Sequence, residues 1–248
     1  MGSGDLLGLL TEFGAECTPE TTLSCGDLVS YQGYDYTTVQ IGEQCWFAEN
    51  LRSENYANGD TIPAGLSDND WQITTSGAVA IYGEGISTCY DNSPDGDACD
   101  EAWSLNEYGL LYNWYAVDDA RGLCPSGWHV PTDGEWMTME MALGISGAEA
   151  NGTGWRGTDQ GSQMKTETGW YNGGNGTNSS GFSGMPGGYS LESGYFVEAG
   201  VSGTWWSSSP SDFSAWYRCL LNTYEGVNRN VHPQRYGCSV RCVQDISN

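Results

Sequence analysis

Basic side chains are scarce in this sequence. Its 248 residues include 32 Asp and Glu but only eight Lys and Arg, so the formal net charge is −24. A surface of this sign repels nucleic acid and anionic membranes, and we expect neither as a partner. No stretch reaches the ~20 apolar residues that a transmembrane helix needs, so we expect no insertion into a membrane.

Histidine and zinc-type cysteine motifs are also scarce. The chain has two histidines and no CxxC pair, although it has nine cysteines. This pattern favours disulfides over zinc, and disulfides form in oxidising compartments. We therefore expect an extracellular protein, on a cell surface or a virion.

No secretory signal peptide is visible at the start of the chain. Met1–Phe13 lacks a basic n-region and an A-x-A cleavage site. Either the leader has been removed, or the protein leaves the cell without the general secretion route. The second alternative favours a component assembled on a particle such as a phage. Leu6, Leu7, Leu9, Leu10 and Phe13 could form a short amphipathic helix. We expect residues 1–30 to form a segment that docks on another subunit of a surface or virion assembly, or on the chain's own domain.

Glycine and large aromatics are abundant. The 36 glycines, 11 tryptophans and 15 tyrosines indicate a folded, loop-rich domain rather than a disordered chain. Alternation predicts strands in residues 34–41, with a turn at Gly42-Glu43, and around 205–208, 215–221 and 239–243. We expect a helix in residues 108–117 and a single domain over residues 31–248.

One helix start is marked clearly. Thr132 and Glu135 have the spacing of a capping box, and Trp136, Met139 and Leu143 would then share one helical face. His129 precedes this helix in a GWHVP segment. We expect His129 to be a structural, hydrogen-bonded residue.

Seven segments carry a family resemblance. In chain order they are IGEQCWFAENL (41–51), YGLLYNWYAV (108–117), LCPSGWHVPTDGEW (123–136), GFSGMPGGY (181–189), WWSSS (205–209), AWYRCL (215–220) and YGCSVRCV (236–243). The chain resembles the Fibrobacter succinogenes major paralogous domain family over roughly residues 34 to 245. That family is similar to the C-type lectin-like and formylglycine-generating-enzyme-like fold group. The resemblance implies an α+β, C-type lectin-like fold, stapled by disulfides, with paired terminal strands, one or two helices and long Gly-rich loops.

The expected cysteine pairs come partly from the family resemblance and partly from spacing in the sequence. The resemblance implies a Cys124–Cys242 disulfide, because lectin-like domains join comparable elements. Cys89 and Cys99 flank a loop, and Cys17 and Cys25 enclose another. Cys219 and Cys238 lie on neighbouring strand candidates and could form a further bridge. Cys45 is then left without a partner.

An acidic loop offers the one metal hypothesis. Asp91, Asp95 and Asp97 place oxygen ligands at alternate positions around a glycine, which suits calcium. Pro94 and the missing final Glu depart from an EF-hand loop. A solvated turn is the competing interpretation. We expect no cofactor other than calcium.

Catalytic motifs are not apparent. No GxSxG or HExxH segment occurs, and we expect that the protein is not an enzyme. Cys238-x-x-x-Cys242 invites comparison with the cysteine pair of formylglycine-generating oxidases. On a regular strand those two sulfurs would be about 13 Å apart, too far to act together.

The segment from Trp216 to Tyr236 is the candidate binding surface. Residues 212–241 hold four arginines against Asp212 and Glu225, a local net charge of +2 in an acidic chain. Tyr, Asn and Arg are typical of adaptable binding surfaces. The expected ligand-contacting residues are Tyr217, Asn222, Tyr224, Asn228, Arg229, Asn230, His232, Gln234, Arg235 and Tyr236. We expect Trp205 and Trp206 to lie in the core beneath them.

These features favour an extracellular or virion-surface adhesin that recognises an unknown ligand on a host or neighbouring cell surface. A purely structural subunit of a capsid, tail, filament or surface layer is the alternative. An oxidase of the formylglycine-generating type is a more distant one.

Overall fold

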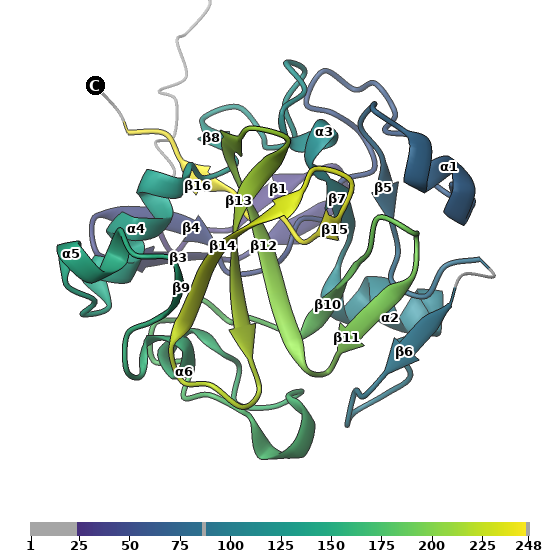
Figure 1. Cartoon of the computed structure of the whole chain (residues 1–248). Helices are drawn as coiled ribbons and strands as arrows, with labels where there is room; N and C mark the ends of the chain where they lie inside the picture. Colours follow the sequence, from purple (N-terminus) through teal and green to yellow (C-terminus); the bar gives the residue numbers. More distant parts are fainter. Residues whose placement is uncertain (1–23, 86–87, 247–248) are drawn as a thin grey trace, which may run out of the picture.

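The computed structural model describes residues 24–85 and 88–246. A mixed sheet forms the centre of the molecule, and its longest strands are β12 (Ser202–Ser211), β13 (Ser214–Leu221) and β14 (Val227–Pro233). These three antiparallel strands cross the middle of Figure 1, with α4 and α5 on one side and α1 and α2 on the other. The ladder that they form is the scaffold of the candidate site.

The central sheet has ten strands among the described residues. Their order is β5 (Val79–Ala80), β7 (Leu111–Asn113), β15 (Gly237–Cys238), β10 (Gly187–Ser190), β12, β13, β14 and β9 (Gly154–Arg156), while β11 (Phe196–Ala199) pairs with β10 and β6 (Cys89–Asp91) pairs with β11. A smaller sheet has the order β3 (Thr38–Ile41), β4 (Gln44–Phe47), β16 (Val243–Gln244) and β8 (Trp128–His129). A separate hairpin joins β1 (Val29–Tyr31) to β2 (Tyr34–Tyr36).

The expected pairing of terminal strands is confirmed. Strand β16 lies antiparallel to β4, with Val243 opposite Trp46. The predicted strand over residues 34–41 is present as two strands, β2 and β3, and the turn follows at Gly42-Glu43. The chain therefore closes on itself, and its last strand completes the small sheet.

The expectation of one or two helices is wrong. The described residues contain α1 (Asp68–Ile73), α2 (Glu101–Tyr108), α3 (Trp114–Val117), α4 (Asp133–Ala142), α5 (Gly147–Ala150) and α6 (Gln160–Met164), together with a 3₁₀ turn, η1 (Tyr171–Gly173). Only α2 and α4 are longer than six residues. Short polar side chains accept a hydrogen bond from the first turn of five of these helices, which explains why so many begin in loops.

Two local predictions have different outcomes. The capping box is confirmed, because Thr132 and Glu135 exchange side-chain and backbone hydrogen bonds at the start of α4, and Trp136 and Met139 on that helix are buried. The helix expected over residues 108–117 is wrong, since residues 111–113 form β7 and only 114–117 are helical. Asn113 ends the strand and caps α3 through its side chain.

The two tryptophans of β12 lie in the core, as predicted. Both are fully buried, and because neighbouring strand residues face opposite ways, they enter different clusters. Trp205 packs with Phe182 and Trp136, and Trp206 packs on the side of Ala215 and Trp114. The sheet thus has a core on each side of β12.

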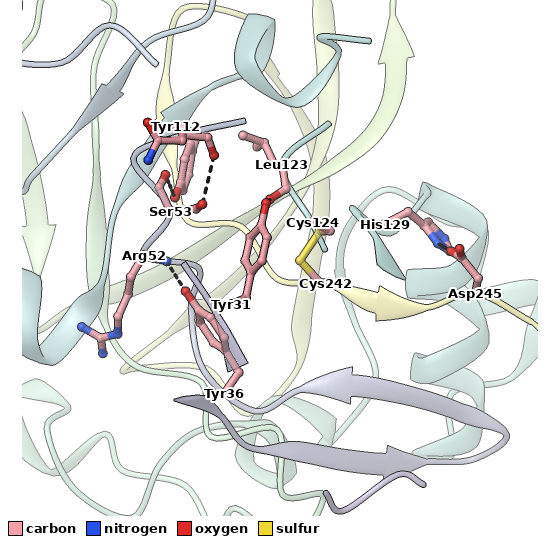
Figure 2. Close-up of a disulfide and its surroundings, with 11 residues drawn as sticks. Tyr31, Tyr36, Arg52, Ser53, Tyr112, Leu123, Cys124, His129, Cys242 and Asp245 are labelled. Carbon is pink, nitrogen blue, oxygen red and sulfur yellow. Dashed lines mark hydrogen bonds and ion pairs between the residues drawn. A yellow bond between two sulfur atoms is a disulfide. The ribbon is translucent and has the colours of Figure 1, made fainter. Parts of the chain in front are cut away.

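Three disulfides staple the described residues. The predicted Cys89–Cys99 and Cys124–Cys242 bonds are confirmed. Figure 2 shows the Cys124–Cys242 bond tying the last strand to the segment before β8, with Tyr31 donating a hydrogen bond to the Leu123 carbonyl beside it.

The predicted Cys17–Cys25 bond is wrong, because Cys25 bonds Cys45 instead. Cys17 itself lies outside the described residues. The Cys25–Cys45 bond joins the segment before β1 to β4, a contact that local spacing in the sequence could not reveal. Cys45, which we expected to have no partner, is therefore paired.

The predicted Cys219–Cys238 bond is also wrong, since both thiols are free. Strand β12 lies between them, with Thr204 opposite Cys219 on one side and its carbonyl bonded to the Ser239 amide on the other. Next-nearest strands are roughly 10 Å apart, and a disulfide needs Cα atoms within roughly 7 Å. The two strand candidates that carry these cysteines are therefore not adjacent in the sheet.

Candidate functional site

Alternate residues of β13 and β14 share one side of the central sheet. Tyr217 lies opposite Asn230, and Cys219 lies opposite Asn228, so these four side chains point the same way. His232, two residues after Asn230, points that way too. The strands thus gather five residues that are scattered over the sequence from 217 to 232.

Further aromatic residues extend this surface. Strand β9 places Trp155 opposite Asn228, and rings of Tyr189 and Tyr236 pack on His232. We call the set the aromatic–amide face, and it comprises Trp155, Tyr189, Tyr217, Cys219, Tyr224, Asn228, Asn230, His232 and Tyr236. The sequence predicted six of these residues. It missed Trp155 and Tyr189, which come from distant strands, and it assigned Cys219 to a disulfide.

A stack of rings occupies one end of the aromatic–amide face. The imidazole of His232 lies between Tyr217, at 3.8 Å between centroids, and Tyr236, at 4.4 Å. Tyr189 stacks beside them, 5.9 Å from Tyr236. Rings packed in this way hold their polar edges in fixed positions at low cost in side-chain entropy.

The other end is an exposed ring pair. Trp155 and Tyr224 are parallel within 8°, with centroids 4.5 Å apart. Their exposed fractions, 38% and 48%, are high for aromatic residues of a folded protein. A stacked but solvent-facing pair offers flat apolar area to a ligand.

Burial sets the charge state of this face. It lowers the pKa of His232 to about 4, so the imidazole is neutral above pH 5. It also raises the pKa of Tyr189, Tyr217 and Tyr236 above the ordinary tyrosine value. These four rings are therefore uncharged at neutral pH.

Many polar atoms of the face have no protein partner among the described residues. The hydroxyls of Tyr189, Tyr217 and Tyr236 make no hydrogen bond, and neither ring nitrogen of His232 does. Asn230 uses its Oδ1 for the Val231 amide but leaves its NH₂ group unused. Asn228 Oδ1 is buried without a partner. Apart from Asn228 Oδ1, these atoms are open to solvent, so they are free to bond to water or to a ligand.

Arg229, which we expected on this face, and Arg218 lie on the opposite side of the sheet. Arg218 is fully buried and pairs with Asp133 at 2.8 Å and with Glu140 at 2.5 Å. Arg229 is buried too, pairs with Asp133 at 2.7 Å and stacks over the Trp216 ring. The expected role of Arg229 in ligand contact is therefore wrong, because its side chain is a core element.

These ions form one buried network. Glu140 accepts hydrogen bonds from both Arg156 and Arg218, and Asp133 accepts from Arg218 and Arg229. Burial opposes ionisation of Asp133, but the bonds from its two arginines outweigh it and lower the pKa of that carboxyl. The network ties α4 to β9, β13 and β14 beneath the aromatic–amide face.

The local positive charge is consequently not a surface patch. Arg241 is fully buried and donates to Asn50 Oδ1 and to the Ser183 carbonyl. Of the four arginines in residues 212–241, only Arg235 is half-exposed, and it donates to the Thr74 carbonyl. Counting charges along the sequence gave a wrong picture of the surface, because successive residues of a strand face opposite sides and half of their side chains point into the core.

Three other predicted ligand contacts lie near the face but outside the ring stack. Asn222 is half-buried in the β13–β14 turn and donates to the Tyr171 carbonyl. Gln234 and Arg235 follow β14 and border a cavity that Phe213 and Tyr115 also line. These residues occupy the rim rather than the centre of the face.

The calcium hypothesis gains no geometric support. Asp91 Oδ1 accepts from the Ser93 amide and Asp97 Oδ1 from the Cys99 amide, as in simple turns. Within residues 24–85 and 88–246, His, Cys, Asp and Glu side chains form no group of three that could hold a metal ion. Binding of calcium through Asp91, Asp95 and Asp97 stays a prediction.

The oxidase comparison loses its cysteine pair. Cys242 is bonded to Cys124, so Cys238-x-x-x-Cys242 holds one free thiol. Burial raises the pKa of both Cys219 and Cys238, which keeps them as neutral thiols at neutral pH.

His129 is hydrogen-bonded, as predicted. It bridges Glu135 on α4, at 2.8 Å, and Asp245 after β16, at 2.5 Å. Figure 2 shows His129 beside Asp245. The bond with Glu135 and, less strongly, that with Asp245 raise the pKa of His129 to about 9. The residue forms ion pairs that hold the segment after β16 against α4, and it is not part of the aromatic–amide face.

No helix of the described residues has the length and apolar character required to cross a bilayer. Comparison with curated proteins and with solved structures finds no match. Residues 39–244 match the family described as Fibrobacter succinogenes major domain, which is well over half of the sequence. The chain belongs to the Fibrobacter succinogenes major domain family, as its ordered motifs predicted.

Proposed function

We propose that this protein is a non-catalytic recognition module that binds a ligand on a host or neighbouring cell through the aromatic–amide face. The observation that carries the proposal is the set of unpartnered polar atoms there, held between two groups of stacked rings. Rigid tyrosines with adaptable amides are typical of binding surfaces. The buried arginine network beneath them supplies a stiff support.

We further propose that the module works outside the cell or on a virion, in a C-type lectin-like fold. Three disulfides are consistent with an oxidising environment. The paired terminal strands and the long central strands support the lectin-like assignment. Residues 1–30 remain our candidate for docking to other subunits, although most of them lie outside the described residues.

Attachment of protein-coated beads to a panel of intact microbial cells tests the recognition function. The face variant carries Tyr217→Phe, Tyr224→Ala and Asn230→Ala, three changes that leave the buried network intact. The control variant carries Tyr90→Ala and Met141→Ala, two exposed residues outside the face.

We expect the face variant to lose at least ten-fold in attachment while the control matches the unmodified chain, because each face change removes contact area or a hydrogen bond. Equal attachment by both variants would contradict the proposal and favour the alternative, a structural subunit of a surface assembly.

A further inference from the structure

The aromatic–amide face carries no charged side chain. In a chain of net charge −24 its members are aromatic rings, two amides and a thiol. Carboxylates lie at its border, since Glu198 helps to raise the pKa of Tyr189 and Tyr217, and Glu192 helps to raise that of Tyr236. An anionic ligand would be repelled by that border, and a cationic one would find no carboxylate within the face to pair with. The border therefore disfavours an anionic ligand, and the face itself is uncharged.

The polar groups of the face are also of one kind. Tyrosine hydroxyls, amides and a neutral imidazole each offer both a donor and an acceptor. A ligand rich in hydroxyl groups matches such a set, because every hydroxyl likewise donates and accepts. Sites built to bond hydroxyls discriminate strongly, since their own buried polar groups are left unpaired by any ligand without them.

The spacing of the two ring groups favours an extended ligand. Trp155 is opposite Asn228, and the imidazole of the ring stack comes from His232, four residues further along β14. Four residues of a strand span about 13 Å. Asn230 lies between the two groups, so apolar area at the ends encloses amides in the middle. A chain of several linked rings can use all three parts at once.

We infer that the ligand of the aromatic–amide face is an uncharged glycan, seated with ring C–H groups on Trp155 and Tyr224 and with hydroxyls toward Asn228, Asn230 and the tyrosine hydroxyls. This inference rests on the proposed function, because it names the ligand class of the same face. A protein ligand is the competing class, because hot spots for proteins are enriched in Trp, Tyr and Arg, but the face holds no arginine. At the ring-stack end the inner ring surfaces are already covered by one another.

Binding of the full chain to immobilised polysaccharides tests the inference. The uncharged probes are mannan, β-glucan and galactan, and the anionic ones are alginate and polygalacturonate. We expect at least one uncharged probe to bind and neither anionic probe to do so. Periodate, which cleaves vicinal diols, should abolish the signal from the bound polysaccharide.

Single variants locate the binding. Tyr217→Phe removes only a hydroxyl and Asn230→Ala only an amide, so we expect each to lower the affinity by about tenfold. Tyr90→Phe, the same hydroxyl deletion at an exposed position outside the face, should leave the affinity unchanged. Thermal unfolding of each variant confirms that the fold is retained.

Failure of this inference can be told apart from failure of the proposed function. If no uncharged polysaccharide binds, while cell attachment depends on the face and is lost when the cells are treated with protease, the ligand is a protein and the glycan assignment is overturned. Binding to anionic probes alone, or binding that Tyr217→Phe and Asn230→Ala leave unchanged, would overturn it as well. If cell attachment is insensitive to the face variant, both proposals fall.

Discussion

At the scale of single residues, the two histidines illustrate how environment decides charge. His129 sits between two carboxylates and has a pKa of about 9, whereas burial among rings lowers the pKa of His232 to about 4. Because the chain has only these two histidines, their ring signals can be followed separately by NMR. We expect one to titrate near pH 9 and the other near pH 4. Two titrations near pH 6.5 would contradict both environments.

The raised pKa of His129 makes a prediction about stability. The stabilisation from its protonated form is complete below the unfolded value of about 6.5 and is lost as the pH rises through about 9. The ring is 37% exposed, so solvent screening limits the effect to about 1 kcal/mol. Urea unfolding at pH 6.5 and pH 9.5 should show this loss in the unmodified chain.

His129→Gln is the control for that loss, because glutamine keeps a hydrogen-bonding side chain but does not titrate. We expect the difference in the free energy of unfolding between pH 6.5 and pH 9.5 to be smaller in the variant. A loss of equal size in the variant would assign the pH dependence to other groups.

The buried carboxylate Glu140 makes a larger prediction. Glu140→Gln would leave Arg156 and Arg218 without the charge that both use, in a fully buried position. Removing one partner of a buried ion pair costs about 3–5 kcal/mol. Denaturant unfolding should show a loss of that size in the free energy of unfolding.

Arg121→Gln provides the comparison. Arg121 pairs with Asp60 and Asp119 at the surface, where solvent screens ion pairs and they contribute little to stability. Similar losses for the two variants would mean that the network around Glu140 is not the support that we describe.

At the scale of elements, the disulfides differ in the loops that they close. Cys124–Cys242 spans 118 residues and Cys89–Cys99 spans ten. The loop-entropy account gives about 5 kcal/mol for the long loop and about 3 kcal/mol for the short one. We expect Cys124→Ser with Cys242→Ser to lower the unfolding temperature more than Cys89→Ser with Cys99→Ser. The reverse order would show that loop entropy does not govern these bonds.

The sequence predicted elements whose signals are local. The capping box of Thr132 and Glu135, the turn at Gly42-Glu43 and the Cys89–Cys99 loop each lie within about ten residues, and all three are present. The family resemblance supplied Cys124–Cys242. The Cys25–Cys45 bond was missed. It depends on how the segment before β1 packs against β4, and short-range spacing in the sequence does not encode that contact.

The candidate site shows the same limit more sharply. Tyr217, Asn228, Asn230 and His232 were predicted and do share a face, but Arg229, between two of them, faces the core. Composition counts every residue of a strand, although only alternate ones reach each side. The register of β13 against β14 was needed to separate ligand contacts from the arginine network.

At the scale of the whole molecule, charge and function are arranged on different surfaces. The chain has a net charge of −24, while three of its eight basic residues, Arg156, Arg218 and Arg229, neutralise buried carboxylates beneath the central sheet. The aromatic–amide face is left as an uncharged area. This separation agrees with our proposal that recognition takes place there.

The most direct test of that placement uses the two histidines as reporters. Surface material is released from cells to which the protein attaches and is added to protein labelled with ¹⁵N in its imidazole rings. Our account predicts that the resonances of His232, in the ring stack, shift as the material binds, while those of His129 do not. Binding that shifts His129 alone, or that leaves His232 unchanged, would contradict recognition through this face.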